Sequence, residues 1–144
     1  MIYQRAKQEL RECIQSQDAA AGEAALARCA AEKVVPDVLL YTMLMRCYAK
    51  QRNYPSARQV LTRMQAAGVQ PTVVTYNTLL SCCGNGIQAQ RLVQDMVVPP
   101  DVVTYNTLLS CYKHSPGSRR TMYGVVATMR AAGLKPDLVT YNTL

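Results

Sequence analysis

The strongest constraint on the fold of this chain is a ten-residue string that occurs twice without change. VVTYNTLLSC stands at Val73–Cys82 and again at Val102–Cys111. A weaker relative, VLLYTMLMRC, begins at Val38, and LVTYNTL begins at Leu138. The starts at 38, 73, 102 and 138 are 35, 29 and 36 residues apart. Self-similarity at such a period indicates a repeat array in which each repeat is one supersecondary unit.

Each unit is expected to form two helices. The first begins near the repeated string and runs to about Lys50, Gly84 or His114, where turn-forming residues follow. In the second helix, apolar residues recur at the i, i+3, i+4, i+7 spacing of one helix face: Ala57, Val60, Leu61 and Met64. Gly68 and Gly133, each followed closely by a Pro, are suited to end the second helices.

This pattern divides the chain into five segments. They are a degenerate repeat at 1–37, repeats at 38–72, 73–101 (shortened) and 102–137, and the start of a further repeat at 138–144. In the degenerate repeat we expect helices at Tyr3–Gln15 and Ala19–Glu32. A helix pair cannot bury its apolar face alone, so the pairs must stack on their neighbours. We therefore predict an all-α fold, an α-solenoid of stacked antiparallel helix-turn-helix repeats, and we expect the chain to be a piece of a longer array.

Composition agrees with thin helical layers. The 144 residues include nine Tyr but no Phe and no Trp, so small residues must fill the space between helices. The net charge of +7 is compatible with an anionic partner, but a soluble protein with no such partner can carry it too. No apolar run reaches the roughly 18 residues of a membrane span. Glu9, Glu12 and Asp18 argue against a targeting peptide at the N-terminus.

The cysteines have a packing interpretation. Cys47, Cys82 and Cys111 are each the tenth residue of a unit, which favours a small buried position between helices. No CxxC occurs and His114 is the single His, so the chain lacks the ligand pattern of a four-ligand zinc site. Cys111 and His114 would share a helix face, but two ligands do not make a site. We predict no metal, no cofactor and no catalytic residues.

Helix pairs at a period near 35, opening VVTYNTLL and closing G-x-x-P-D, resemble pentatricopeptide repeats. The resemblance covers Val38–Leu144 and is faint in residues 1–37. It implies a right-handed superhelix that binds single-stranded RNA at about one base per repeat. Tetratricopeptide repeats are the nearest alternative, but their Trp and Leu-Gly signature is missing.

The resemblance also assigns roles to residues. Base-reading side chains in the first helices would be Thr42, Asn77, Asn106 and Asn142. Their partners at the closing positions would be Thr72, Asp101 and Asp137. Aliphatic side chains that sandwich the base would be Leu39, Val74, Val103 and Val139. Asn with a closing Asp implies U, Asn alone a pyrimidine and Thr a purine, which gives 5′-purine-U-U-3′ followed by a pyrimidine.

The chemistry of the side chains supports these roles. An Asn amide offers a donor and an acceptor in one plane, which suits the Watson–Crick edge of a pyrimidine. An Asn repeated on an exposed face would be free to meet a ligand, whereas a buried one would need a protein partner. The alternative is that Asn77 and Asn106 are helix caps. Thr75 and Thr104 are better placed for that role in VVTYN, which leaves the Asn inside the first turn.

Residues four apart on a helix share a face, so polar stripes should continue from the readers. Arg46 and Lys50 follow Thr42 at this spacing and could neutralise RNA phosphates. The matching stripes would be Asn77, Ser81 and Asn85, and then Asn106, Ser110 and His114. An ordinary solvated helix surface would look the same. The shortened repeat could also tilt Asn77 or Asp101 out of reading geometry.

The function predicted from the sequence is RNA binding, not catalysis, in support of RNA processing, stability, editing or translation. Single-stranded RNA is the expected partner, with protein partners in a processing complex and no membrane or small-molecule substrate. The alternatives are a tetratricopeptide-like protein scaffold and the recognition arm of a larger RNA-processing enzyme. The resemblance implies a mitochondrial or chloroplast location.

Overall fold

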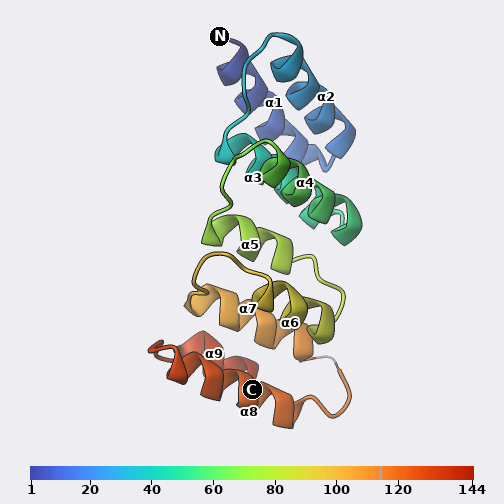
Figure 1. Cartoon of the computed structure of the whole chain (residues 1–144). Coiled ribbons are helices and arrows are strands. Elements are labelled where there is room, and N and C mark those ends of the chain that lie inside the picture. The colour runs from blue at the N-terminus through green and yellow to red at the C-terminus, as the bar shows by residue number, and fades with distance from the viewer. Residues whose placement is uncertain (114) are drawn as a thin grey trace. The chain divides into compact units, whose positions relative to one another are not determined.

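The computed structural model describes residues 1–113 and 115–144, and helices are the only regular elements among these residues (Figure 1). They are α1 (Ile2–Ser16), α2 (Ala19–Ala31), α3 (Val38–Lys50), α4 (Tyr54–Ala66), α5 (Val73–Leu80), α6 (Gly86–Gln94), α7 (Val102–Tyr112), α8 (Arg119–Ala131) and α9 (Leu138–Thr143). The all-α prediction is confirmed. In the described part of the chain no helix is both long and apolar enough to cross a bilayer.

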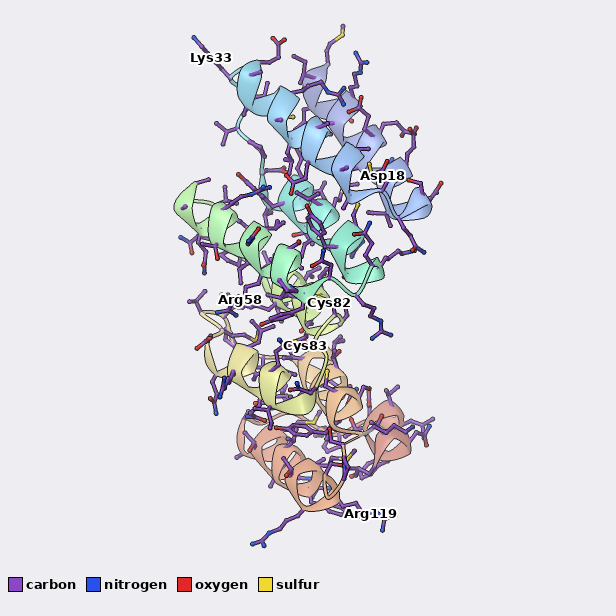
Figure 2. The ribbon with its side chains drawn as sticks, turned by 90° about the vertical axis from the view of Figure 1, so that its right-hand side faces the viewer. Asp18, Lys33, Arg58, Cys82, Cys83 and Arg119 are labelled. Atoms are coloured by element: carbon purple, nitrogen blue, oxygen red, sulfur yellow. The ribbon has the colours of Figure 1, made fainter. Side chains whose placement is uncertain are left out.

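The chain divides into two compact units. The first is Met1–Cys82 and the second is Cys83–Leu144, so the boundary falls between two adjacent cysteines (Figure 2). Helices α1 to α5 belong to the first unit, and α6 to α9 belong to the second. The two helices expected in residues 1–37 are present as α1 and α2, with ends within one residue of the predicted ones.

The residues that close the predicted repeats start the next helices. Thr72, Asp101 and Asp137 have extended backbones and are the N-caps of α5, α7 and α9. Each side chain accepts a hydrogen bond from the backbone N–H three residues on, and the Thr at that third position bonds back to the backbone N–H of the cap. The prediction that Thr75 and Thr104 are themselves the caps is therefore wrong, because they already lie in the first helical turn.

In the first unit α3 is the central element. It contacts α1, α2, α4 and α5, and its Leu40, Leu44 and Met45 are fully buried. A polar network joins three helices beside this core. The Tyr48 hydroxyl of α3 donates to Glu23 of α2 at 2.7 Å, and Arg63 of α4 donates to the same carboxylate at 3.0 Å. Each helix thus packs only on its neighbours or next neighbours, as stacked repeats require.

In the second unit α7 is the central element. It contacts α6, α8 and α9, and it buries Leu108 and Leu109. The ring of Tyr112 lies against Gly86 at the start of α6, where a Cβ atom would come within 2.1 Å of the ring. In α8, Met129 is completely buried. The turn after this helix uses Gly133 with a φ of 79°, a left-handed conformation that favours glycine, and Gly68 has the same role after α4.

The cysteines lie in packing positions. Cys47 and Cys82 are buried and Cys111 is half-buried. Burial is the main cause that raises the pKa of Cys47 to about 12, so this thiol stays protonated at neutral pH. The described residues contain no group of three potential metal ligands. His114, which the sequence analysis paired with Cys111 and placed at the end of a helix, lies outside the described residues.

Candidate nucleic-acid interface

The predicted reading pair of the second unit is in direct contact. Asn106 lies in the second turn of α7, and Asp137 is the N-cap of α9. The amide Nδ2 of Asn106 donates to Oδ1 of Asp137 at 3.0 Å, although the residues are 31 positions apart. A third residue completes the cluster, because the hydroxyl of Thr140 donates to Oδ1 of Asn106 at 2.5 Å.

Asn106 is less accessible than the sequence analysis expected. It is only 9% exposed, and its amide is held by protein groups at both ends. The expectation of a fully free amide is therefore wrong for this residue. The second Nδ2 hydrogen has no acceptor among the described residues. Asn106 is not a helix cap, in agreement with the sequence analysis.

The carboxylate of Asp137 is stabilised in its charged form. The backbone N–H of Thr140 is the main cause that lowers the Asp137 pKa, followed by the Asn106 amide and the Thr140 hydroxyl. In the described part of the chain every hydrogen bond to this carboxylate ends on Oδ1. Oδ2 therefore remains as a charged acceptor on an exposed residue.

The first unit holds a different pair. The buried Thr42 hydroxyl donates to the backbone oxygen of Val38 at 2.7 Å and lies 3.2 Å from the hydroxyl of Thr75. Thr75 also lies 3.3 Å from the hydroxyl of Thr72. The two predicted readers, Thr42 and Thr72, are therefore bridged by Thr75.

The remaining predicted readers lie in α5, at the start of α7 and in α9. Asn77 lies half-buried in α5 of the first unit, whereas Asp101 caps α7 in the second, so their pairing remains a prediction. Asn142 is exposed in α9.

Each predicted base-sandwiching residue is an exposed aliphatic side chain. Leu39 is 40% exposed, Val74 49%, Val103 56% and Val139 57%. Each is the second residue of α3, α5, α7 or α9, three positions before the predicted reader, and therefore on the same face of the helix. A single exposed Val is ordinary on a protein surface. The repeated placement beside the reader is what makes these residues a candidate contact surface.

Of the predicted polar stripes, one is present along its whole length. Arg46 and Lys50 are exposed on α3 at four and eight positions after Thr42. The stripe Asn77–Ser81–Asn85 is wrong beyond its first residue, because α5 ends at Leu80. Ser81 is its C-cap, and Asn85 starts α6. In the third stripe, Ser110 donates to the backbone oxygen of Asn106 at 3.1 Å, and His114 lies outside the described residues.

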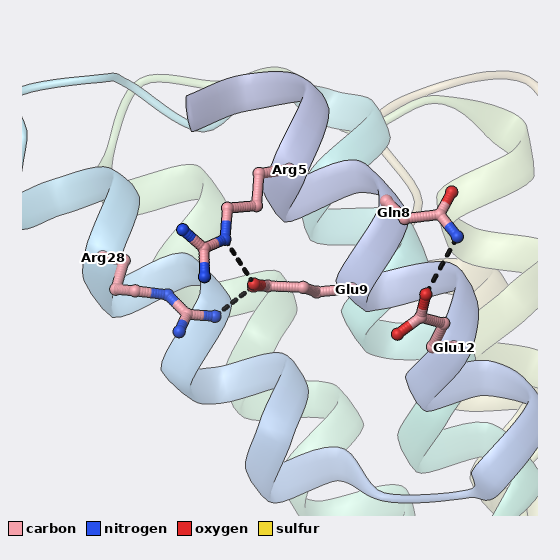
Figure 3. Close-up of polar contacts among 5 residues, drawn as sticks. All are labelled: Arg5, Gln8, Glu9, Glu12 and Arg28. Atoms are coloured by element: carbon pink, nitrogen blue, oxygen red, sulfur yellow. Dashed lines mark hydrogen bonds and ion pairs between the residues drawn. The ribbon is translucent and has the colours of Figure 1, made fainter. Parts of the chain in front are cut away.

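The degenerate repeat carries polar side chains at the matching positions. With Cys13 aligned to Cys47, Arg5 corresponds to the exposed Leu39 and Gln8 to Thr42. Arg5 and Arg28 both pair with Glu9, and Gln8 donates to Glu12 at 2.9 Å (Figure 3). Arg5, and not an aliphatic residue, therefore stands at the predicted base-sandwiching position of this repeat.

Two kinds of side-chain contact were not predicted from the sequence. Thr140 and Thr75 contact the predicted reader of the preceding repeat, and the signal for them was the Thr at the third place of LVTYN and VVTYN. Tyr3 was missed as well. Its hydroxyl donates to Oδ2 of Asp37 at 2.7 Å. The equivalent oxygen of Asp137 accepts no hydrogen bond from the described residues.

The chain is similar to several known proteins. The family model described as pentatricopeptide repeat domain matches residues 26–86 and 91–144. A mitochondrial pentatricopeptide repeat-containing protein of Arabidopsis thaliana is 31% identical over 115 residues, which are 77% of this chain and 28% of that protein. The small ribosomal subunit protein mL103 of the same plant is 29% identical over 119 residues, 78% of this chain and again 28% of the relative.

Solved structures show the same fold. The pentatricopeptide repeat protein PPR10 in complex with an 18-nt psaJ RNA element matches with a TM-score of 0.77 and 26% identity, over 93% of this chain and 20% of that one. Nuclear protein-only RNase P 2 of Arabidopsis thaliana matches at 0.71 and 20% identity, over 94% and 32%. The α-solenoid prediction is confirmed by these likenesses. The family model covers most of the residues, and the chain belongs to the pentatricopeptide repeat family.

Proposed function

We propose that this chain binds single-stranded RNA at about one base per repeat and reads bases with the first helices of its repeats. The observation that carries the proposal is the direct contact between Asn106 and Asp137. It places a donor and a charged acceptor side by side, three positions from an exposed Val103. Support also comes from the likeness to PPR10, which was solved in complex with an RNA element.

The Asn106–Asp137 pair suits uracil. The remaining N–H of Asn106 can donate to a uracil carbonyl, and Oδ2 of Asp137 can accept from the adjacent imino N–H. In the same pose cytosine would turn its N3 acceptor toward the carboxylate, which is unfavourable. We therefore propose U at this position, and U at Asn77–Asp101 if those side chains pair in the same way.

The other positions follow the family pattern. Thr42 would favour a purine and Asn142 a pyrimidine, so the preferred order is 5′-purine-U-U-3′ and then a pyrimidine. The combination of Thr42 with Thr72 carries no base assignment of its own. Arg46 and Lys50, both exposed on the face of Thr42, would neutralise phosphates. A good base contact discriminates against the wrong base by about 1–3 kcal/mol in the analogous DNA case. Association itself costs about 4–15 kcal/mol, so a few repeats alone should bind weakly.

Exchange of Asn106 for Ala tests base reading. We expect the wild-type chain to bind a U-rich oligoribonucleotide more tightly than an A-rich one in fluorescence anisotropy, and Asn106→Ala to reduce this difference by the share of one reader. Thr128→Ala, an exposed position on α8, is the matched control and should keep it. Equal binding of the two oligonucleotides by the wild-type chain would show that the chain does not read bases. A protein scaffold of tetratricopeptide type would give the same negative result.

The larger setting is proposed from the relatives. Relatives in Arabidopsis thaliana are named mitochondrial and chloroplastic, and we propose an organellar role in RNA processing, stability, editing or translation for this chain as well. The chain spans about a quarter of the length of these curated relatives or less. It would then act as a binding part of a larger protein or processing complex, with any catalytic step carried out by other parts.

A further inference from the structure

The amide of Asn106 has a defined direction. An ionised carboxylate can only accept hydrogen bonds, so the nitrogen and not the oxygen of Asn106 must face Asp137. The amide oxygen then faces Thr140, whose hydroxyl lies 2.5 Å away and can supply a hydrogen. The two contacts therefore hold the amide by opposite ends and leave one N–H as the group that a ligand can meet.

Thr140 is itself held firmly. It is completely buried, and its hydroxyl oxygen accepts from the backbone N–H of Asp137 at 3.1 Å. Its own backbone N–H donates to Oδ1 of Asp137 at 2.9 Å. The single hydroxyl hydrogen faces two acceptors, Asn106 at 2.5 Å and Asp137 Oδ1 at 2.9 Å, and the shorter contact is the one to Asn106. The hydroxyl is thus an anchored donor aimed at the reader of the preceding repeat.

We propose that Thr140 is a positioning residue that sets the base preference of the Asn106–Asp137 pair without touching the base. This inference rests on the proposed RNA-binding function. Without the hydroxyl, the nearly buried Oδ1 of Asn106 loses its hydrogen-bond donor, which is costly inside a protein. The amide is then held through its nitrogen alone, so the direction of its remaining N–H is less firmly fixed and the discrimination between U and C weakens.

The first unit shows the same relation between neighbouring repeats. Thr75 stands at the third position of α5, as Thr140 does in α9, and its hydroxyl lies 3.2 Å from the reader Thr42. A third-position Thr therefore contacts the preceding reader in both units. Thr75 also forms the same capping box. Removal of its hydroxyl also ends the contact with Thr42, and it is a control for the loss of a capping box that does not hold Asn106.

The first measurement needs no RNA. The whole chain is labelled with 15N-Asn, and the variant Asn106→Ser identifies the Asn106 side-chain signal in the NMR spectrum. Solvent exchange of the Asn106 N–H that faces Asp137 should be slow. Thr140→Val keeps the shape but removes the hydroxyl, and it should speed this exchange. Thr140→Ser should restore the slow rate, and Thr75→Val should leave it unchanged. Unaltered exchange in Thr140→Val would overturn the proposal.

The second measurement is the ratio of affinities for U and C at one oligonucleotide position, chosen as the position where Asn106→Ser alters the preference. Thr140→Val should lower this ratio about three- to ten-fold, the equivalent of one hydrogen bond. Thr140→Ser should restore it, and Thr75→Val should retain it. A parallel loss of affinity for both bases, with the ratio unchanged, would show a purely structural Thr and overturn the proposal.

The two measurements separate two kinds of failure. If the wild-type chain binds no oligonucleotide, the proposed function is wrong, and specificity control by Thr140 falls with it. The exchange measurement would still decide whether Thr140 orients the amide. If RNA binds with a U preference that Asn106→Ser removes but Thr140→Val does not alter, the proposed function stands and the positioning role is wrong.

Discussion

Asp137 serves two purposes with one carboxylate. It caps α9 by accepting from the backbone N–H of Thr140, and it holds the amide of Asn106 from the preceding repeat. Both interactions need the charged form or are strengthened by it, because hydrogen bonds to an ionised acceptor are stronger than neutral ones. A residue at this position therefore couples helix formation to the geometry of the candidate reading pair.

The coupling predicts a dependence of stability on pH. The pKa of Asp137 is lowered below its ordinary value of 3.8 in the folded state, mainly by the Thr140 N–H. Its contribution is therefore complete above pH 3.8 and is lost as the pH falls further, through the folded pKa. We expect Asp137→Asn to flatten the fall in the free energy of unfolding below pH 3.8, measured by urea titrations followed by circular dichroism. Parallel profiles for the wild type and the variant would contradict this assignment.

At the scale of helices, the same string of residues gives two different elements. VVTYNTLLSC forms an eight-residue helix in α5 but belongs to an eleven-residue helix in α7. The residues that follow decide between them. Cys83 and Gly84 lead α5 into a turn before the cap Asn85, whereas Tyr112 continues α7 and packs its ring on Gly86. Helix length in a shortened repeat is thus set by its turn and by packing.

Two glycines of the second unit test this packing. Gly86→Ala would place a Cβ within 2.1 Å of the Tyr112 ring, and we expect a loss of about 1–3 kcal/mol in the free energy of unfolding from overpacking. Gly124 lies inside α8 with nothing within 4 Å of such a Cβ. Gly124→Ala should therefore stabilise the helix by roughly 0.5–1 kcal/mol. Chemical denaturation of both variants measures the two effects, and a neutral Gly86→Ala would show that the Tyr112 ring can move aside.

The sequence predicted the existence and the starts of the helices better than the details of the site. The repeated string located α5 and α7, and the Gly residues located the turns after α4 and α8. The cap assignment failed by three residues, because Asp101 and Thr104 both belong to cap-forming residue types and only the backbone distinguishes them. The contact of Asn106 with Thr140 joins residues 34 apart, and no local pattern specifies such a distance.

At the scale of the whole chain, the positive charge is concentrated in two repeats. Residues 38–72 contain five basic and no acidic groups, and residues 102–137 contain five basic groups and one acidic group. Of the basic residues in the first of these repeats, Arg46 and Lys50 are exposed on the face of α3 that carries Thr42. Others, such as Arg58 and Arg63, lie on the second helix of the repeat, α4.

This distribution predicts how RNA binding depends on salt. Each neutralised phosphate of a single strand contributes about 0.7 to the slope of log K against log salt. Arg46→Gln with Lys50→Gln should therefore reduce the slope by about 1.4. The control is Arg58→Gln with Arg120→Gln, on second helices, which removes the same charge and should leave the slope nearly unchanged. Equal slopes for both double variants would indicate a diffuse charge effect and no defined phosphate contacts.

The residues that close these repeats also limit how the chain can change its preference over time. Thr72, Asp101 and Asp137 are helix N-caps, a position that tolerates mainly Ser, Thr, Asp, Asn and Gly. A mutation to any other type would weaken a helix before any new preference could be selected. The set of residues available to specify a base at this place is therefore the short set that can start a helix. Recoding by one substitution is easiest within that set, for instance Asp to Asn or Thr to Ser.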